Sequence, residues 1–79
     1  MDAERVAKLE SVFRAVFEMP PDKDVRNLRQ ISERKWDSLA HVMLVSAIES
    51  EFGTTIDTGD ALRMTSYAAT QLVLEERGL

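Results

Sequence analysis

The stretch Trp36–Phe52 (WDSLAHVMLVSAIESEF) restricts the fold most, because it holds more apolar side chains than one helix face can accommodate. At about 100° per residue, a first stripe contains Leu44, Val45, Ile48 and Phe52 together with His41. A second stripe contains Leu39, Val42 and Met43, beside Ser46 and Ser50. We therefore expect a helix that buries the first stripe in its own core and offers the second to a partner.

The chain before this stretch predicts one helix and a long connection. Residues 2–18 repeat apolar residues at helical spacing, with Asp2 as the expected N-cap, and Pro20–Pro21 closes the segment. Residues 20–36 form a connection that is longer than most loops of compact domains. Three apolar residues, Val25, Leu28 and Ile31, are spaced to dock this connection on the bundle, and Trp36 anchors its end.

Two further helices are predicted after the stretch. Gly53 suits the left-handed position that ends a helix. Asp57 or Thr58 then caps a short, mobile helix that runs to about Met64 and draws its few apolar contacts from Ile56, Leu62 and Met64. The last helix opens at Thr65 or Ser66 and ends near Gly78. Two stripes compete for its inner face: Ala69, Leu72, Val73 and Glu76 on one side, and Tyr67, Gln71 and Leu74 on the other.

These patterns predict an all-α fold without strands. We expect a small four-helix bundle, with three longer helices, one short helix and a long first loop, as a single domain over residues 1–79. A chain of 79 residues is near the size at which one core is only just sufficient. The chain contains no cysteine, which excludes disulfides and thiolate metal sites.

Charge is distributed unevenly along the chain. Residues 1–36 contain seven acids and eight bases, whereas residues 37–79 contain seven acids and only two bases, Arg63 and Arg77. The acidic half disfavours nucleic acid as a ligand. It would attract a basic protein partner, although a solvated acidic face that aids solubility explains the pattern equally well. Since we find neither a signal peptide nor an apolar run of membrane-spanning length, we expect a soluble, cytoplasmic monomer.

Asp37 and Ser38 stand where the second helix begins. If Asp37 caps the helix, Ser38 lies in its first turn with its hydroxyl outside the packed core. The free N–H groups of a first turn favour an anion, by about 0.3–1 kcal/mol, so a phosphoester on Ser38 would be tolerated. Taken alone, an Asp–Ser pair before an apolar run is more often simply a helix start.

The wider pattern adds a resemblance. Asp37-Ser38-Leu39, followed by Leu44, Ile48, Glu49, Glu51 and Phe52-Gly53, resembles the acyl carrier protein family, and the order of elements matches over nearly the whole chain. The resemblance implies that a phosphopantetheinyl transferase attaches phosphopantetheine from coenzyme A to Ser38. It further implies a non-catalytic carrier, because the reactive thiol belongs to the cofactor and holds acyl or aminoacyl thioesters.

Partners follow from the same resemblance. It implies that acyl-loading ligases or acyltransferases, synthases and other pathway enzymes contact the second helix through basic patches. Leu39, Val42 and Met43 would supply apolar contact, and Asp37, Glu49 and Glu51 would supply charge. Many fatty-acid carriers have acids where this chain has Ala40 and Met43. Trp36 and His41 are more similar to carriers of specialised polyketide, hybrid or polysaccharide-linked pathways.

The sequence is also compatible with other functions. One alternative is a housekeeping fatty-acid carrier, and another is an unmodified helical adaptor that binds basic partners through the second helix. A third is a small hydrolase using Ser38 and His41, which would also need an orienting carboxylate and an oxyanion site. We expect His41 instead to be half-buried beside Leu44 and Val45, or to line the exit of the arm. A single histidine with scattered carboxylates predicts no metal site.

Overall fold

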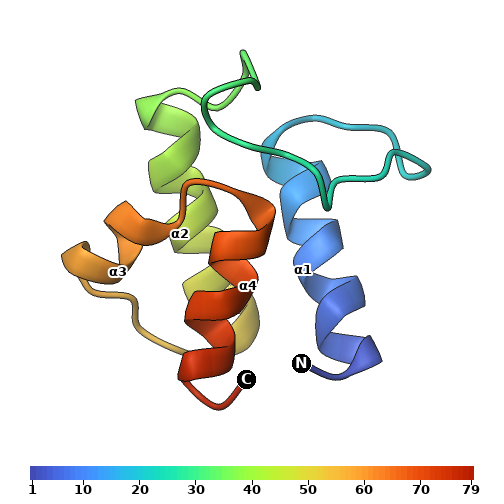
Figure 1. Cartoon of the computed structure of the whole chain (residues 1–79). Coiled ribbons are helices and arrows are strands. Elements are labelled where there is room, and N and C mark those ends of the chain that lie inside the picture. Colours follow the sequence, from blue (N-terminus) through green and yellow to red (C-terminus); the bar gives the residue numbers. More distant parts are fainter.

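Each of the four helices begins at a side-chain cap. The computed structural model describes residues 1–79, with helices α1 (Ala3–Val16), α2 (Ser38–Phe52), α3 (Thr58–Arg63) and α4 (Tyr67–Glu76). The side chains of Asp2, Asp37, Asp57 and Ser66 each accept a hydrogen bond from the backbone N–H three residues further on. Figure 1 shows the bundle that results, and it contains no strand. The predicted all-α bundle of three longer helices and one short helix is confirmed.

The ends of α1 and α2 also follow from local sequence. Gly53 caps α2 with a left-handed backbone (φ 61°), which costs least for a residue without a Cβ. α1 ends at Val16, ahead of Pro20, and Phe17 turns its side chain into the core, where it is 1% exposed. Helix boundaries therefore lie within a few residues of those predicted.

One apolar core joins the helices and the first loop. Its fourteen buried residues are Leu9, Val12, Phe13, Phe17, Val25, Trp36, Ala40, Leu44, Ile48, Ile56, Met64, Tyr67, Val73 and Leu74. The ring of Phe13 lies at the centre of an aromatic group, with its centroid 5.7 Å from that of Trp36 and 5.0 Å from that of Tyr67. Trp36 thus anchors the end of the loop, as predicted.

The long loop is held against the start of α4 by backbone hydrogen bonds. Gln30 N donates to Thr65 O (2.9 Å), and Tyr67 N donates to Leu28 O (3.0 Å). The loop consequently crosses the end of the bundle at which α2 and α4 begin (Figure 1). Val25 is buried and Leu28 is half-buried, as predicted, but Ile31 is exposed. The docking predicted for Ile31 is wrong, because the backbone pairing, not an apolar contact at this position, fixes the loop.

The last two helices correct two further expectations. Leu62 is exposed on α3 and adds nothing to the core, whereas Ile56 and Met64 on either side of the helix are buried. The inner face of α4 is neither of the two competing stripes. It consists of Tyr67, Thr70, Val73 and Leu74. Thr70 is tolerated there because its hydroxyl donates to Ser66 O (2.8 Å).

Ion pairs connect α3 to α4. The guanidinium of Arg63 donates to both carboxylate oxygens of Glu76 (2.8 and 2.9 Å), and Arg77 donates to Asp60 (2.7 Å). Hydrogen bonds from Arg77 and Arg63 lower the pKa of Asp60 below its ordinary value of 3.8. The bond from Arg63 likewise lowers the pKa of Glu76. α3 is short, as expected, but these contacts oppose the mobility that we also expected for it.

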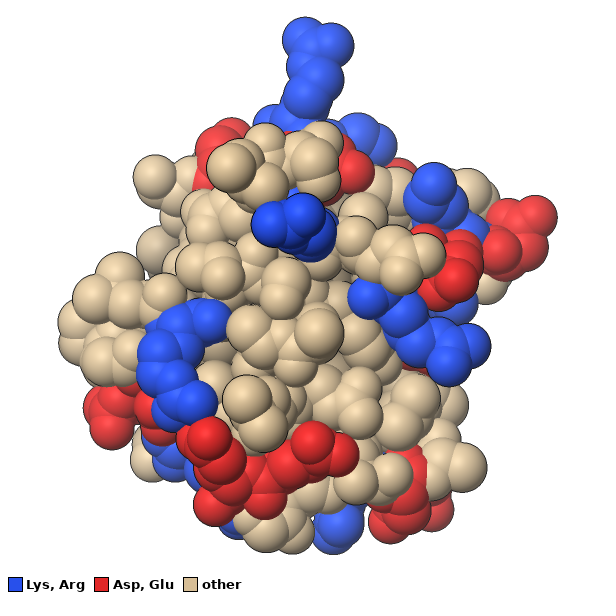
Figure 2. All heavy atoms as spheres, in the orientation of Figure 1, with Lys and Arg blue, Asp and Glu red and all other residues tan.

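Positive charge on the surface is mixed with negative charge. On the face shown in Figure 2, Lys and Arg side chains project at the loop end with Asp and Glu beside them. Arg26 of the loop lies 3.1 Å from Glu10 of α1 and 3.8 Å from Asp24. The basic half of the sequence therefore does not form an unbroken basic surface on this face.

Candidate functional site

Ser38 is the first residue of α2, and its side chain is exposed. Asp37 caps the helix by accepting a hydrogen bond from Ala40 N (2.8 Å), and Asp37 O accepts the first helical bond, from His41 N (2.9 Å). The N–H groups of Ser38 and Leu39 precede these bonds and have no acceptor within the protein. An enzyme could reach the hydroxyl from outside, and the two free N–H groups favour negative charge beside it.

Trp36 fixes where this hydroxyl stands. The indole is only 3% exposed and lies against the ring of Phe17, with the two centroids 4.8 Å apart. Two residues later the chain has left the core, because Asp37 adopts the extended backbone of an N-cap (φ −92°, ψ −175°). A buried anchor and an exposed serine thus lie within three successive residues, which limits the positions that the hydroxyl can occupy.

His41 uses both of its ring nitrogens inside the protein. Trp36 Nε1 donates to His41 Nδ1 (3.0 Å), and His41 Nε2 lies 2.8 Å from Ala61 O of α3. The two rings are stacked, with centroids 6.2 Å apart. His41 is half-buried as predicted, but the hydrogen bonds to Trp36 and α3 were not foreseen. Since neither nitrogen is left to accept a proton from Ser38, the geometry disfavours the Ser38–His41 hydrolase.

This bridge had a weak signal in the sequence. A histidine on the inner stripe of a helix needs partners for two nitrogens, and Trp36, five positions earlier, holds the only indole N–H of the chain. The carbonyl of Ala61 could not have been identified, because a sequence does not show which backbone oxygen of a later helix faces the ring.

The second apolar stripe of α2 is exposed, as predicted. Leu39 is 70% exposed, Val42 is 65% exposed and Met43 is 49% exposed, so none of the three belongs to the buried core. These three side chains form one surface, which we call the α2 apolar face. It begins one residue after Ser38, so a protein that reaches the serine would also meet this face.

The two glutamates expected to supply charge are placed differently from that expectation. Glu49 borders it in line with Val42, but its carboxylate accepts a hydrogen bond from Ile56 N (2.8 Å) and so closes the connection to α3. Glu51 lies on the side of α2 that faces α1, where Lys8 Nζ donates to its backbone oxygen (3.3 Å). Asp37 remains at the end of the face, with its carboxylate capping the helix.

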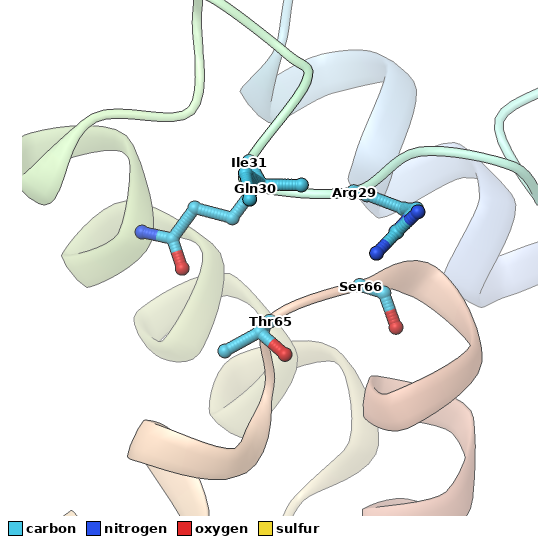
Figure 3. A pocket seen from close by; sticks show the side chains of 5 residues that line it. All are labelled: Arg29, Gln30, Ile31, Thr65 and Ser66. Carbon is cyan, nitrogen blue, oxygen red and sulfur yellow. The ribbon is translucent and has the colours of Figure 1, made fainter.

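Two surface hollows lie beside the elements described above. The first, of about 310 Å³, follows the seam between α2 and α3 and is lined by His41, Val42, Val45, Ser46, Glu49, Ile56, Thr58 and Ala61. The second, of about 520 Å³, lies between the loop and the start of α4. Figure 3 shows its lining, in which Arg29, Gln30 and Ile31 of the loop lie opposite Thr65 and Ser66. No sequence pattern marks this second, mostly polar hollow, because backbone pairing between the loop and Thr65–Tyr67 creates it.

Comparisons with known proteins found no relative of this chain. Neither the protein-family models, nor the curated proteins, nor the solved structures include a match to this chain. None of the four helices combines the length and the apolar character that crossing a bilayer requires. The structure also brings no three His, Asp or Glu side chains together in a way that could hold a metal ion.

Proposed function

We propose that this protein is a carrier of the acyl carrier protein type, with Ser38 as the attachment residue for phosphopantetheine. One observation carries the proposal: the DSL serine stands exposed on the first turn of α2, between a buried tryptophan anchor and an exposed apolar face. The order of helices and the long first loop agree with the same family resemblance.

The residues around Ser38 suit a phosphoester. Ser38 Oγ would displace 3′,5′-ADP from coenzyme A and form a phosphodiester, while its proton passes to a base of the transferase. The free N–H groups of Ser38 and Leu39 favour the added negative charge. Asp37 holds this turn in place through its bond to Ala40 N, so the ester does not need to order the helix end itself. The group, once attached, supplies the thiol on which acyl or aminoacyl cargo is carried.

The α2 apolar face suits the partners of such a carrier. Transferase, loading ligase or acyltransferase, and synthase must each approach the attachment serine, and the face begins beside it. Because the carboxylate of Glu49 is bonded to Ile56 N and Glu51 lies on the side facing α1, we propose that apolar contact through Leu39, Val42 and Met43 dominates recognition, with Asp37 as its charged edge. A specialised polyketide, hybrid or polysaccharide-linked pathway fits this weakly acidic face better than housekeeping fatty-acid synthesis.

Intact mass tests the proposal. The protein is incubated with coenzyme A, Mg²⁺ and a phosphopantetheinyl transferase of broad specificity, beside a known carrier as control. We expect one added phosphopantetheine in the wild type and in Ser46→Ala, a matched change on the exposed side of α2, and none in Ser38→Ala. An unmodified wild type, under conditions that load the control carrier, would contradict the proposal.

One other function shares a specific observation with this one. An unmodified adaptor would also bind its partner through an exposed apolar helix face, and Leu39 and Val42 form such a face. The same mass experiment separates the two, because only the carrier gains mass at Ser38.

A further inference from the structure

The bridge between Trp36, His41 and Ala61 joins α2 to α3 close to Ser38. His41 is three residues after Ser38, so the two side chains are neighbours on the surface of α2. On its other side His41 reaches Ala61 O of α3 (2.8 Å). A group attached at Ser38 that turned into the seam between α2 and α3 would therefore meet the imidazole first.

The chemistry of the three groups fixes the proton on His41. An indole N–H only donates, so His41 Nδ1 accepts from Trp36. A backbone carbonyl only accepts, so His41 Nε2 carries the proton and donates to Ala61 O. The bridge is therefore a directed chain of two hydrogen bonds through a neutral imidazole. Moving His41 aside would leave a buried indole N–H without a partner.

Behind the bridge, side chains fill the interior. Leu44, Ile48 and Met64 are 0% exposed, and Trp36 closes the space towards Phe13 and Phe17. The hollows of the molecule all lie at its surface, and the one along the seam reaches only to Val45 and Ile56. An alkyl chain lying there would keep one side in water.

α3 is held on its far side as well. The bonds from Arg63 to Glu76 and from Arg77 to Asp60 tie it to α4, while His41 ties it to α2. Opening the seam by swinging α3 outward would therefore break contacts on both sides. A cargo that stays outside the seam leaves all of these contacts intact.

We propose that the Trp36–His41–Ala61 bridge keeps the bundle closed, so that the cargo is a short or polar acyl group that stays in solvent. This inference rests on the proposed carrier function, and it names the class of substrate held at Ser38. Long alkyl cargo, which requires shelter from water, is the class that the bridge excludes.

The test compares carriers that differ only in cargo length. The protein is loaded from acetyl-, hexanoyl- and dodecanoyl-coenzyme A, and each form is melted and recorded by amide NMR. We expect the same melting temperature for all three and an unchanged Trp36 indole N–H signal, because cargo outside the core cannot stabilise the fold. A melting temperature that rises with chain length, or an indole signal that moves with dodecanoyl cargo, would overturn the inference.

Two variants test the bridge itself. In His41→Ala, dodecanoyl cargo should raise the melting temperature above that of the acetyl form, since α3 loses its bond to α2 and the missing imidazole leaves space in the seam. In His41→Gln, the amide can still accept from Trp36 and donate to Ala61, and length dependence should stay absent. Absence of any length dependence in a folded His41→Ala protein would show that the bridge is not what closes the core.

Failure of the two proposals can be distinguished. If wild-type protein gains no phosphopantetheine while a control carrier does, the carrier function fails. If it loads normally but long cargo stabilises it, only the inference about cargo fails. Should His41→Ala not fold, the wild-type series alone still decides between enclosed and exposed cargo.

Discussion

The two sides of α2 are both apolar in sequence, yet their surroundings are opposite. Leu44 and Ile48 on one side are fully buried against the other helices, whereas Leu39 and Val42 on the other are mostly exposed. Burial of the first side stabilises the fold, and exposure of the second stabilises nothing in the isolated chain. An exposed apolar surface of this kind is the feature on which the proposed contact with partner enzymes depends.

The largest expected effect concerns the buried side. Leu44→Ala should lower the free energy of unfolding by about 2–5 kcal/mol, because it removes buried methyl groups and leaves a cavity. Leu39→Ala, the matched change on the exposed side, should stay within about 0.5 kcal/mol of the wild type. Urea unfolding followed by circular dichroism measures both. Equal losses would mean that the two sides do not differ in burial.

A substitution on the exposed side of α2 should weaken recognition by the transferase and leave the stability of the fold nearly unchanged. Val42→Asp should lower kcat/KM for transfer of phosphopantetheine about tenfold, which is about 1.4 kcal/mol, because a charge would enter the contact. Its free energy of unfolding should change by no more than about 0.5 kcal/mol. Ser50→Asp, on the same side of α2 but further from Ser38, controls for added charge. If both variants slow the transfer equally, net charge and not the face explains the result.

The third comparison concerns Asp37, whose side chain caps the N-terminus of α2 and can be replaced without changing either apolar side of the helix. Asp37→Ala should cost about 0.5–2 kcal/mol of stability, since Ala40 N loses its acceptor. Asp37→Asn keeps an oxygen in the same place and should recover most of the loss, as thermal melts would show. An Asn variant as unstable as the Ala variant would point to charge, and not to the cap, as the cause.

The smallest expected effect concerns the ion pairs between α3 and α4. The pKa values of Asp60 and Glu76 are lowered in the folded protein, so their contribution is fully present above the ordinary values of 3.8 and 4.5. It is lost as the pH falls through the lower folded-state pKa values. We expect melts between pH 6 and about pH 3 to show a decline that high salt weakens.

A pair of variants sharpens this last test. Glu76→Gln removes the carboxylate that binds Arg63, so its melting temperature should fall less than that of the wild type as the pH is lowered. Glu51→Gln, which removes a carboxylate that makes no ion pair, should leave the profile unchanged. Identical profiles for wild type and Glu76→Gln would show that the pair contributes no measurable stability, as is common for exposed pairs.

Local patterns predicted most of the fold and part of the site. Asp2, Asp37 and Gly53 act as predicted because capping depends on only a few neighbouring residues. Ile31 and Leu62 were wrongly expected to pack, since spacing alone does not show whether another segment lies opposite. The bridge of His41 escaped prediction for the same reason, because it joins residues twenty positions apart.

By itself, the sequence determined the four capped helices, the buried stripe of α2 and the position of Ser38 at a helix start. These follow from interactions within a few residues along the chain. Only the tertiary structure decided which face of α4 turns inward, where Glu49 and Glu51 point, and how His41 ties α2 to α3. Such features depend on which groups meet across the core, and this is set by the packing of all the helices together.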